Sequence, residues 1–312
     1  MIGYLLYQIA AALASFLPVR VSYFFARRIS EVKYLADKYS RHSVRSNLRR
    51  VLPEGVNDGE RKKVEKQVFR NFSCFVVDFL RLSNGSGRKE DSRVTVEGWE
   101  RIKSALQKKK GLILTTAHFG NWELGASLLA RSGFRLKVVA RRHENRRINK
   151  FFNRRRERFG IEVLEQGGSK SSVLGWLREG GCIAILADRQ LGGSGGKATF
   201  FGHDTVLPRA HVALALRTGA PLIPGFVRRE RNGDCKVIIE PEIELSDLGK
   251  NRSAVRTGVE RCLVVFEDFI RLHPDQWFVF DEVWPEKTRR KPDDLTGALS
   301  EGQRSAFASP GP

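Results

Sequence analysis

The sequence predicts an α/β fold with a central, largely parallel or mixed sheet flanked by helices. From residue 94 onward, short aliphatic or β-branched runs alternate with helical patterns, which is typical of strands connected through helices. The chain has 312 residues, 41% of them hydrophobic, and no long low-complexity linker divides it. A chain of this size can bury one large core. We therefore expect one main domain with short appendages, which include an N-terminal membrane-associating helix.

The expected elements follow from hydrophobic spacing. Strands are predicted at Val94–Val96, Leu112–Thr116, Leu136–Ala140, Ile161–Leu164, Ile183–Ala187, Leu222–Val227 and Val237–Ile239. Helices are predicted near residues 59–82, 98–109, 121–132, 145–159, 169–179, 207–218 and 252–272. In the first of these helices the apolar residues recur every three or four positions, so its apolar face needs a partner. Residues 83–92 and 192–196 are predicted as loops because of their glycine and polar content.

The N-terminus carries an uncharged apolar run, residues 2–18, and basic residues follow from Arg20 onward. This order is wrong for a secretory signal, which places positive charge first. The run is near the lower limit for a spanning helix, and its basic flank would lie on the cytoplasmic side. Tyr4 and Tyr7 suit a helix at the membrane surface equally well. We expect residues 1–30 to form a membrane anchor or interfacial helix, and both forms remain open.

The formal net charge is +20, with an isoelectric point near 10.2. Such a chain favours anionic partners: nucleic acid, an acidic carrier protein or phospholipid headgroups. Much of the charge gathers in residues 141–158, where aromatic residues lie between the basic ones. A nucleic-acid-binding protein is the rival from another class, but no recognised binding motif accompanies the charge.

The cysteines and histidines are scattered. The four cysteines form no CxxC pair and lie in apolar or strand-like runs, which is typical of reduced core thiols. No two histidines have the spacing that would place them on one helical face for a metal ion. We therefore expect no metal site.

His118 and Glu123 are the candidate catalytic residues. His118 follows a predicted buried strand, at the edge of the sheet where ligands bind in α/β proteins. Glu123 falls in the first turn of the next helix, and Asn121 is its expected N-cap. A turn containing Gly120 can fold the imidazole back toward the carboxylate, which makes a charge-relay base. The alternative is that Glu123 only complements the helix dipole and His118 is a core histidine.

The string at positions 118–123, His-Phe-Gly-Asn-Trp-Glu, matches the H-x4-D/E motif of glycerolipid and glycolipid acyltransferases. It resembles the version found in the lipid A biosynthesis (late) acyltransferase family. The resemblance extends over about residues 3–285, because further segments follow the family's order: residues 45–52, 69–72, 78–81, 138–141, 156–160, 187–188, 200–202 and 217–221.

The resemblance implies transfer of a fatty acyl chain from acyl carrier protein, or from another acyl thioester, to a hydroxyl of a membrane glycolipid, such as a lipid A precursor. The place would be the cytoplasmic face of a bacterial inner membrane, without a cofactor and without nucleic acid as a partner. It implies His118 as general base and Glu123 as its orienting partner. It also implies functional positions at Arg156 and Asp188, and Arg141 lies in a matching segment, so these three are assigned to substrate binding.

General chemistry agrees with these roles but leaves alternatives. A guanidinium such as that of Arg156 can hold a phosphate in bidentate fashion, although a run of basic residues is usually a solvated face. Asp188 follows a predicted strand and would share the sheet edge with His118, although Asp is also common as a cap where a strand turns into solvent. The glycines of 192–196 lack the lysine and helix start of a nucleotide-binding loop. Phe200 and Phe201 are either lining for an acyl channel or core residues.

The sequence departs from the family in two places. Arg189 lies between Asp188 and Gln190, where the family often has Gln directly after the aspartate. Acidic residues occur within Trp277–Pro285, where lipid A enzymes tend to have a basic stretch. A lysophospholipid or another glycolipid therefore remains an alternative acceptor. A serine hydrolase is not expected, because no GxSxG string lies at a predicted strand-to-helix elbow, and the one at 192–196 falls in a predicted loop.

The domain limits follow from these assignments. Residues 31–287 are expected to form the acyltransferase domain. Residues 288–312 are polar, lack periodicity and are expected to be a disordered tail.

Overall fold

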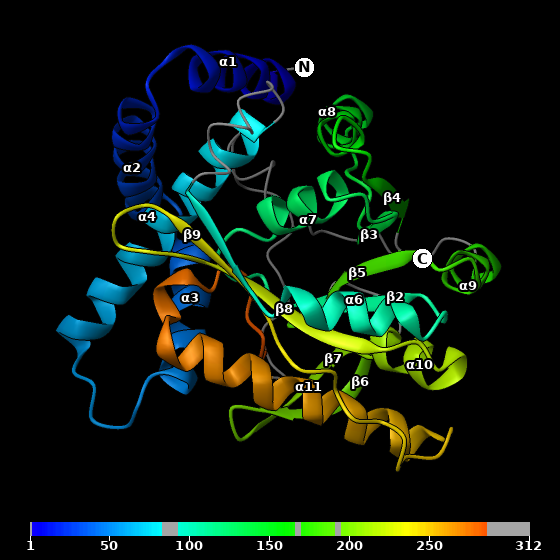
Figure 1. The fold of residues 1–312 in the computed structure, drawn as a ribbon. Coiled ribbons are helices and arrows are strands. Elements are labelled where there is room, and N and C mark those ends of the chain that lie inside the picture. Colours follow the sequence, from blue (N-terminus) through cyan, green and yellow to red (C-terminus); the bar gives the residue numbers. More distant parts are fainter. Residues whose placement is uncertain (1, 83–92, 166–169, 191–194, 286–312) are drawn as a thin grey trace.

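The computed structural model describes residues 2–82, 93–165, 170–190 and 195–285. Within these residues, seven strands form one sheet in the order β1-β9-β8-β2-β5-β3-β4, and the β8–β9 pair is antiparallel while the others are parallel. The predicted α/β class with a mostly parallel central sheet is confirmed (Figure 1). The strands are β1 (Val94–Glu97), β2 (Leu112–Thr116), β3 (Leu136–Ala140), β4 (Glu162–Glu165), β5 (Cys182–Leu186), β8 (Leu222–Arg229) and β9 (Cys235–Ile239).

Helices cover both faces of the sheet. Strand β2 contributes to two cores, since Leu112 and Leu114 belong to one hydrophobic cluster and Ile113 to the other. This alternation is expected for a central strand with helices on either side. The first cluster contains residues of α6 (Trp99–Gln107) and α7 (Trp122–Arg131). The second contains residues of α9 (Lys170–Arg178), α10 (Ala210–Thr218) and α11 (Arg252–Leu272).

Four helices precede the sheet: α1 (Ile2–Phe16), α2 (Val19–Ala36), α3 (Lys38–Val51) and α4 (Asp58–Leu82). The amphipathic helix predicted at 59–82 is α4, and its partners are now known. Its apolar residues pack with Tyr34 of α2, Val44 and Leu48 of α3, and the C-terminal residues Phe278 and Phe280. The helices α2 and α3 and the segment around Phe278 thus meet on α4, which joins the N-terminal helices to the rest of the molecule. Figure 1 shows α4 between these helices and the sheet.

The N-terminal helices differ from the sequence prediction. Residues 1–30 were expected to form a membrane anchor or interfacial helix, but two helices, α1 and α2, lie on either side of Pro18 in this part of the chain. The division expected at residue 30 therefore falls inside α2. Across the described ranges of the chain, no helix combines the length and apolarity needed to cross a membrane.

A hairpin of β6 (Gly195–Phe200) and β7 (His203–Pro208) was not predicted. Gly195 and Gly196, assigned from the sequence to a flexible loop, begin β6 because they pair with Leu207 and Pro208. Phe200 and its neighbour Phe201 are buried against Trp277 and Trp284, so both are core residues. The predicted loop at 83–92, positions 191–194 and the predicted tail at 288–312 lie outside the described residues.

The remaining helix is α8 (Arg146–Glu157), which lies beside α1 at the top of Figure 1. Tyr7 of α1 contacts the rings of Phe151 and Phe152 of α8, with centroid distances of 5.7 and 5.4 Å. All four cysteines are buried and none forms a disulfide.

His211 gives the fold a testable dependence on pH. It is buried in α10, neither ring nitrogen has a hydrogen-bond partner among the described residues, and burial lowers its pKa to about 4. The ring is therefore neutral in the folded chain, while in the unfolded chain it takes up a proton below about pH 6.5. Stability from this residue is fully present above that pH and is lost as the pH falls toward 4, by up to about 3 kcal/mol. His211→Leu should flatten this part of the pH dependence.

The measurement is the free energy of unfolding in urea at pH 7 and pH 5 for both proteins. His203→Leu serves as a control, since that side chain is exposed. An equal loss of stability on acidification in the wild type and in His211→Leu would contradict the assignment.

Candidate active site

His118 and Asp188 are brought together by the pairing of two neighbouring parallel strands. Thr116 of β2 is level with Leu186 of β5, and the backbone N–H of Ala187 donates to the carbonyl of Thr116 at 2.9 Å. His118 lies two residues beyond Thr116, and Asp188 lies two residues beyond Leu186. Equal offsets from a matched pair place both side chains at the same carboxyl edge of the sheet. This is the edge at which ligands bind in open α/β folds.

The contact between these two residues is short and almost fully buried. His118 Nδ1 lies 2.6 Å from Asp188 Oδ1, and the backbone N–H of His118 donates to Asp188 Oδ2 at 2.9 Å. The indole N–H of Trp277 also donates to Oδ2, at 2.8 Å. The carboxylate thus has three donors, which fixes its plane and with it the imidazole ring.

The surroundings set the charge of the pair. Burial lowers the pKa of His118 most, Asp188 opposes this effect, and the nearby cation of Arg189 lowers the pKa further. For Asp188, burial favours the neutral acid, but the ring, the indole and the backbone N–H outweigh it and hold the pKa below its usual value. A neutral imidazole beside an ionised carboxylate is the form that acts as a general base.

The turn after His118 requires glycine at position 120. Gly120 has a φ of +58°, and a Cβ at this position would collide with the carbonyl oxygen of Val227. Its N–H donates to the carbonyl of Gln276, and the N–H of Asn121 donates to that of Val227, both at 2.9 Å. This close approach anchors the turn to β8 and to the C-terminal segment. The side chain of Asn121 then caps α7 by accepting from the N–H of Leu124, as predicted.

A partly buried polar cluster supports this cap from outside the motif. The carboxylate of Asp78 on α4 accepts from Asn121 Nδ2 at 2.9 Å and from the hydroxyl of Tyr23 on α2 at 2.5 Å. Arg229 of β8 forms an ion pair with the same carboxylate and donates to Tyr23 at 3.1 Å. The sequence analysis assigned no role to Asp78 or Arg229. The only sequence signal was that Asp78 lies in a segment resembling the family's N-terminal helices.

Glu123 does not take the place at His118 Nδ1 that the sequence suggested, since Asp188 occupies it. The Glu123 carboxylate instead binds Arg156 of α8, whose Nη2 lies 2.6 Å from Oε1 and whose Nε lies 3.1 Å from Oε2. The reason is geometric: Asp188 arrives on the adjacent strand at the level of the ring, whereas Glu123 starts a helix that packs toward α8. Glu123 raises the pKa of Arg156 despite the opposing effect of burial.

Two of the alternatives left open by the sequence are resolved by burial. Arg156 is an ion-paired and largely buried side chain, so it is not part of a solvated basic face. Asp188 is fully buried, so it is not a solvent-exposed cap. Its predicted place on the same edge as His118 is confirmed by the strand pairing.

Arg141 follows β3, the strand on the other side of β5, so it belongs to the same edge of the sheet. It is partly buried, and its Nη1 has no hydrogen-bond partner among the described residues. Burial lowers the pKa of Arg141, and the carboxylates of Glu144 and Asp281 oppose this effect. Arg141 therefore adds a basic side chain to this edge of the sheet, and its assignment to substrate binding stays a prediction.

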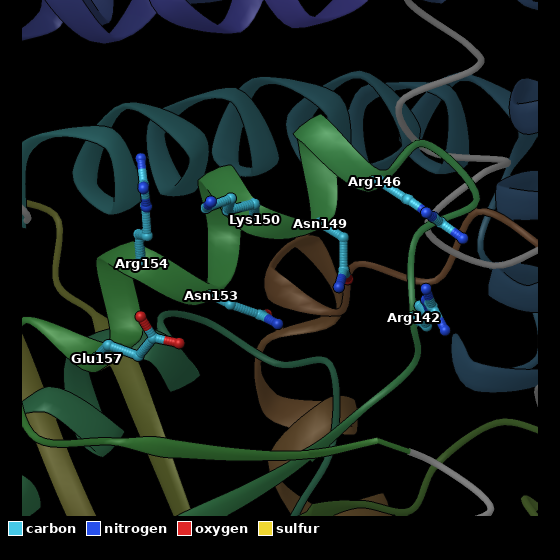
Figure 2. Close-up of a pocket in the computed structure, with 7 residues that line it drawn as sticks. All are labelled: Arg142, Arg146, Asn149, Lys150, Asn153, Arg154 and Glu157. Carbon is cyan, nitrogen blue, oxygen red and sulfur yellow. The ribbon is translucent and has the colours of Figure 1, made fainter.

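The solvent-facing side of α8 carries most of the remaining basic residues of the segment 141–158. A hollow of about 320 Å³, called the α8 hollow below, lies here. It is lined by the residues that Figure 2 labels: Arg142, Arg146, Asn149, Lys150, Asn153, Arg154 and Glu157. Arg146, Lys150 and Arg154 recur every four residues, so they share one face of the helix. Arg156 lies on the buried side and points to Glu123. One helix thus contributes an ion pair inside and a basic surface outside.

The two departures from the family pattern meet in space. Arg189, which follows Asp188, is buried, and its Nη1 lies 3.2 Å from Oδ2 of Asp281. Burial lowers the pKa of Arg189 to about 10, although Asp281 and Asp188 oppose this effect. The neighbouring acidic residue, Glu282, contacts His42 at 3.1 Å. The acidic C-terminal stretch therefore balances basic side chains of this chain.

The comparison with known families agrees with this geometry. Residues 1–286 match the family described as bacterial lipid A biosynthesis acyltransferase. The chain belongs to this family. The resemblance drawn from the sequence is therefore confirmed, and the matched region includes every candidate site residue named above.

The relatives are distant but cover most of the chain. The phosphatidylinositol mannoside acyltransferase of Mycolicibacterium smegmatis is 25% identical over 257 residues, which cover 81% of this chain and 82% of the relative. The protein of the same name from Mycobacterium tuberculosis is 26% identical over 261 residues, covering 81% and 79%. The lipid A biosynthesis palmitoleoyltransferase of Escherichia coli is 24% identical over 245 residues, covering 76% and 78%.

The pair Arg189–Asp281 predicts a shift in pH dependence. Arg189→Gln removes a cation that lowers the pKa of His118 and leaves Asp281, which raises it. The neutral imidazole then protonates at higher pH, so the acidic limb of the activity profile should move up by roughly one pH unit. Arg189→Gln combined with Asp281→Asn should move the limb back toward the wild-type position.

The measurement is the rate of acyl transfer between pH 5 and pH 8 for the three proteins, at equal fraction folded. A limb that stays in place in Arg189→Gln, or that moves down, would contradict the electrostatic coupling.

Proposed function

We propose that this chain transfers a fatty acyl group from an acyl thioester, carried by acyl carrier protein, to a hydroxyl of a membrane glycolipid similar to a lipid A precursor. The observation that carries the proposal is the buried pair of His118 and Asp188 at the carboxyl edge of the sheet. The family and its relatives support glycolipid or lipid A acylation. The place we propose is the cytoplasmic face of a bacterial inner membrane. No dissociable cofactor is needed for this chemistry.

The reaction follows from the orientation of the ring. Asp188 accepts the Nδ1–H of His118, so Nε2 carries the lone pair and takes the proton of the acceptor hydroxyl. The oxygen then forms a bond to the thioester carbon, the C–S bond breaks, and the imidazolium returns its proton to the departing sulfur. The carboxylate stabilises the imidazolium without taking its proton. The histidine alternates between base and acid, and the protons balance.

Glu123 has a positioning role in this scheme. Its carboxylate holds Arg156, and so links the first turn of α7 to α8. A buried ion pair of this kind fixes geometry more than it adds stability, whereas the loss of one partner leaves an uncompensated charge. We propose that the Glu123–Arg156 pair keeps α8, and with it the basic edge that receives the donor, in place beside His118.

The donor proposal rests on charge. The α8 hollow presents Arg142, Arg146, Lys150 and Arg154 to solvent next to the catalytic edge. An acidic carrier protein would be attracted to such a surface, which also raises the rate of encounter. All the residues that line the hollow have polar or charged side chains, two asparagines among them, so hydrogen bonds to the carrier are available as well.

The acceptor has two candidates within one chemical class. The first relatives act, by their names, on phosphatidylinositol mannoside, and another acts on lipid A. Both acceptors are membrane glycolipids with free hydroxyls. A lysophospholipid, which belongs to another class of acceptor, is the alternative. Mass spectrometry of lipids from a strain lacking this chain distinguishes them, because a single missing acyl chain on one lipid identifies the acceptor.

Variants of His118 and Asp188 separate the roles of the two residues. His118→Ala removes the base, and general acid–base catalysis contributes about 10²- to 10⁴-fold, so turnover should fall by that factor. Asp188→Asn keeps the shape but removes the charge that supports the imidazolium, so it should also be severely impaired. Because the two residues act as one unit, the double variant should be scarcely worse than His118→Ala.

The assay is transfer of a labelled acyl group from acyl carrier protein to extracted lipid. Glu123→Gln is the comparison variant: it too should be impaired, but it should also lower the free energy of unfolding by about 3 to 5 kcal/mol, because Arg156 is left buried and uncompensated. Near-normal transfer by His118→Ala would rule out the mechanism, and multiplicative losses in the double variant would show that the residues act separately.

A separate prediction concerns the role of the α8 hollow in binding the donor. The triple variant Arg146→Gln, Lys150→Gln and Arg154→Gln should raise KM for the acyl carrier protein thioester by about tenfold or more and leave kcat unchanged. With an uncharged pantetheine thioester as donor, the variant and the wild type should have the same KM and the same kcat. Rising salt should raise the KM of the wild type for this thioester toward that of the variant, because salt screens exposed charges.

The matched control replaces three exposed basic residues of the N-terminal helices, as Arg49→Gln, Lys62→Gln and Lys63→Gln. This control removes the same charge from another surface. Its KM for the acyl carrier protein thioester should equal that of the wild type. A flat salt profile, or equal effects of the two triple variants, would show that the α8 hollow does not receive the donor.

A further inference from the structure

Two side-chain nitrogens in the segment after β3 are buried without a partner. Nη1 of Arg141 and Nδ1 of His143 are shielded from solvent, and neither forms a hydrogen bond with the described residues. The whole of His143 is only 9% exposed. Such nitrogens are rare in folded chains, because each has lost its contact with water and gained nothing in exchange. Two of them, two residues apart on one segment, indicate that a ligand completes their hydrogen bonding.

The segment after β3 directs alternate side chains to opposite sides. Arg141 and His143 are partly or largely buried, whereas Arg142 and Glu144 are exposed. This alternation is that of an extended chain, so Arg141 and His143 share one side and Arg142 points to the other. Arg142 lines the α8 hollow (Figure 2). The two unpartnered nitrogens therefore belong to a different surface from the one proposed for the carrier protein.

The ring of His143 is held in place by contacts that leave Nδ1 unused. It stacks on the ring of Phe152 of α8, with the centroids 4.8 Å apart and the planes 14° from parallel. The backbone N–H of His143 donates to Oδ1 of Asn149 at 3.1 Å, which ties the segment to the same helix. A polar atom fixed in this way is preorganised for a ligand, because little freedom is lost when the ligand binds.

The charge around His143 is positive. Its pKa is lowered to about 4 by burial and by the cations of Arg156 and Arg141. The charge of Arg156 is balanced by the ion pair with Glu123. Within the described residues no carboxylate forms an ion pair with Arg141, although two of them oppose the effect of burial on its pKa from a greater distance. An anion would balance this charge and would accept a hydrogen bond from each nitrogen.

The strand pairing places this segment at the same height as the catalytic histidine. Strands β2 and β3 both pair with β5, in a register that makes their last residues, Thr116 and Ala140, level. Arg141 and His118 therefore leave the same edge of the sheet, separated by two strand spacings, or about 10 Å. A sugar-phosphate headgroup has this size, whereas the extended phosphopantetheine arm of a carrier protein is far longer. The geometry thus favours a phosphate of the acceptor over that of the donor.

We propose that Arg141 and His143 bind a phosphate group of the lipid acceptor and so hold its hydroxyl at His118. The guanidinium of Arg141 pairs with two phosphate oxygens, and the Nδ1–H of His143 donates to one of them. Both nitrogens are covered in the unliganded chain, and the partly exposed side chain of Arg141 moves to admit the phosphate. The proposal rests on the proposed function for the presence of a lipid acceptor, and it names the acceptor's class: a phosphate-bearing lipid.

Anion binding is measured first, by NMR titration of the His143 ring in the full chain. The probe is sn-glycerol 3-phosphate, and glycerol at equal ionic strength is the control. The bound phosphate should raise the pKa of His143 from about 4 by about one unit or more, because a nearby negative charge favours the protonated ring. In Arg141→Gln the probe should have little effect. A wild-type pKa that stays unchanged at the highest probe concentration would overturn the proposal.

The kinetic test compares two acceptors that differ only in the phosphate between the sugar and diacylglycerol. His143→Phe keeps a ring to stack on Phe152 but removes both nitrogens. This variant and Arg141→Gln should each raise KM for the phosphorylated acceptor by about tenfold and leave kcat unchanged. KM for the phosphate-free acceptor should stay as in the wild type. The free energy of unfolding of His143→Phe should not fall, because the variant removes an unpartnered buried nitrogen.

Two matched controls make the same changes elsewhere. His211→Phe alters another buried histidine without hydrogen-bond partners among the described residues, and Arg252→Gln removes an exposed arginine at the start of α11. Both should keep the wild-type KM for the two acceptors. Equal increases in KM for both acceptors in His143→Phe would contradict the proposal. So would an increase in KM for a phosphopantetheine thioester that is absent with a pantetheine thioester, since the phosphate would then belong to the donor.

The outcomes also separate this proposal from the proposed function. If the phosphate site alone fails, acyl transfer proceeds and KM for the phosphorylated acceptor is the same in the wild type and in the variants. If the proposed function alone fails, sn-glycerol 3-phosphate still raises the pKa of His143, while no acyl transfer is found with any lipid acceptor.

Discussion

The parallel pairing of β2 with β5 is the constraint on which the active site depends. Because Thr116 and Leu186 are level, the chains leave the sheet side by side, and His118 and Asp188 follow at the same offset. A shift of either strand by one residue would turn the side chains of that strand to the other face and separate His118 from Asp188. The register is in turn fixed by burial, since β2 is covered on both sides by hydrophobic clusters. The catalytic geometry is thus a consequence of core packing.

Buried charges around this pair occur together with their partners. Asp78 has Arg229, Glu123 has Arg156, and Arg189 has Asp281. Taking charges out of water is costly, and the cost is tolerated where each charge is paired and hydrogen-bonded. These pairs connect α4 with β8, α7 with α8, and the turn after β5 with the C-terminal segment, which are distant in sequence. The pair of Arg189 and Asp281 also places two opposite charges near His118, where the first lowers and the second raises the pKa of the ring.

The N-terminal helices show how the surroundings can reverse a sequence pattern. The amphipathic helix at 59–82 was recognisable because its apolar residues face a protein core. The helix α2 was not recognised, since its large apolar residues face outward and its serines face inward. The hairpin of β6 and β7 was not predicted for a related reason. It begins with glycines, and its burial depends on Trp277 and Trp284, which lie far along the chain.

The sequence by itself determined the fold class, the order of most strands and helices, and the importance of His118, because these follow from local periodicity and from a contiguous motif. It also placed Asp188 on the correct edge. Only the tertiary structure decided which carboxylate meets the imidazole, since Glu123 is five residues away along the chain but Asp188 is the neighbour across the sheet. Hydrogen bonding acts over a few ångströms of space, and the pairing of strands, which no short segment encodes, decides which residues come within that reach.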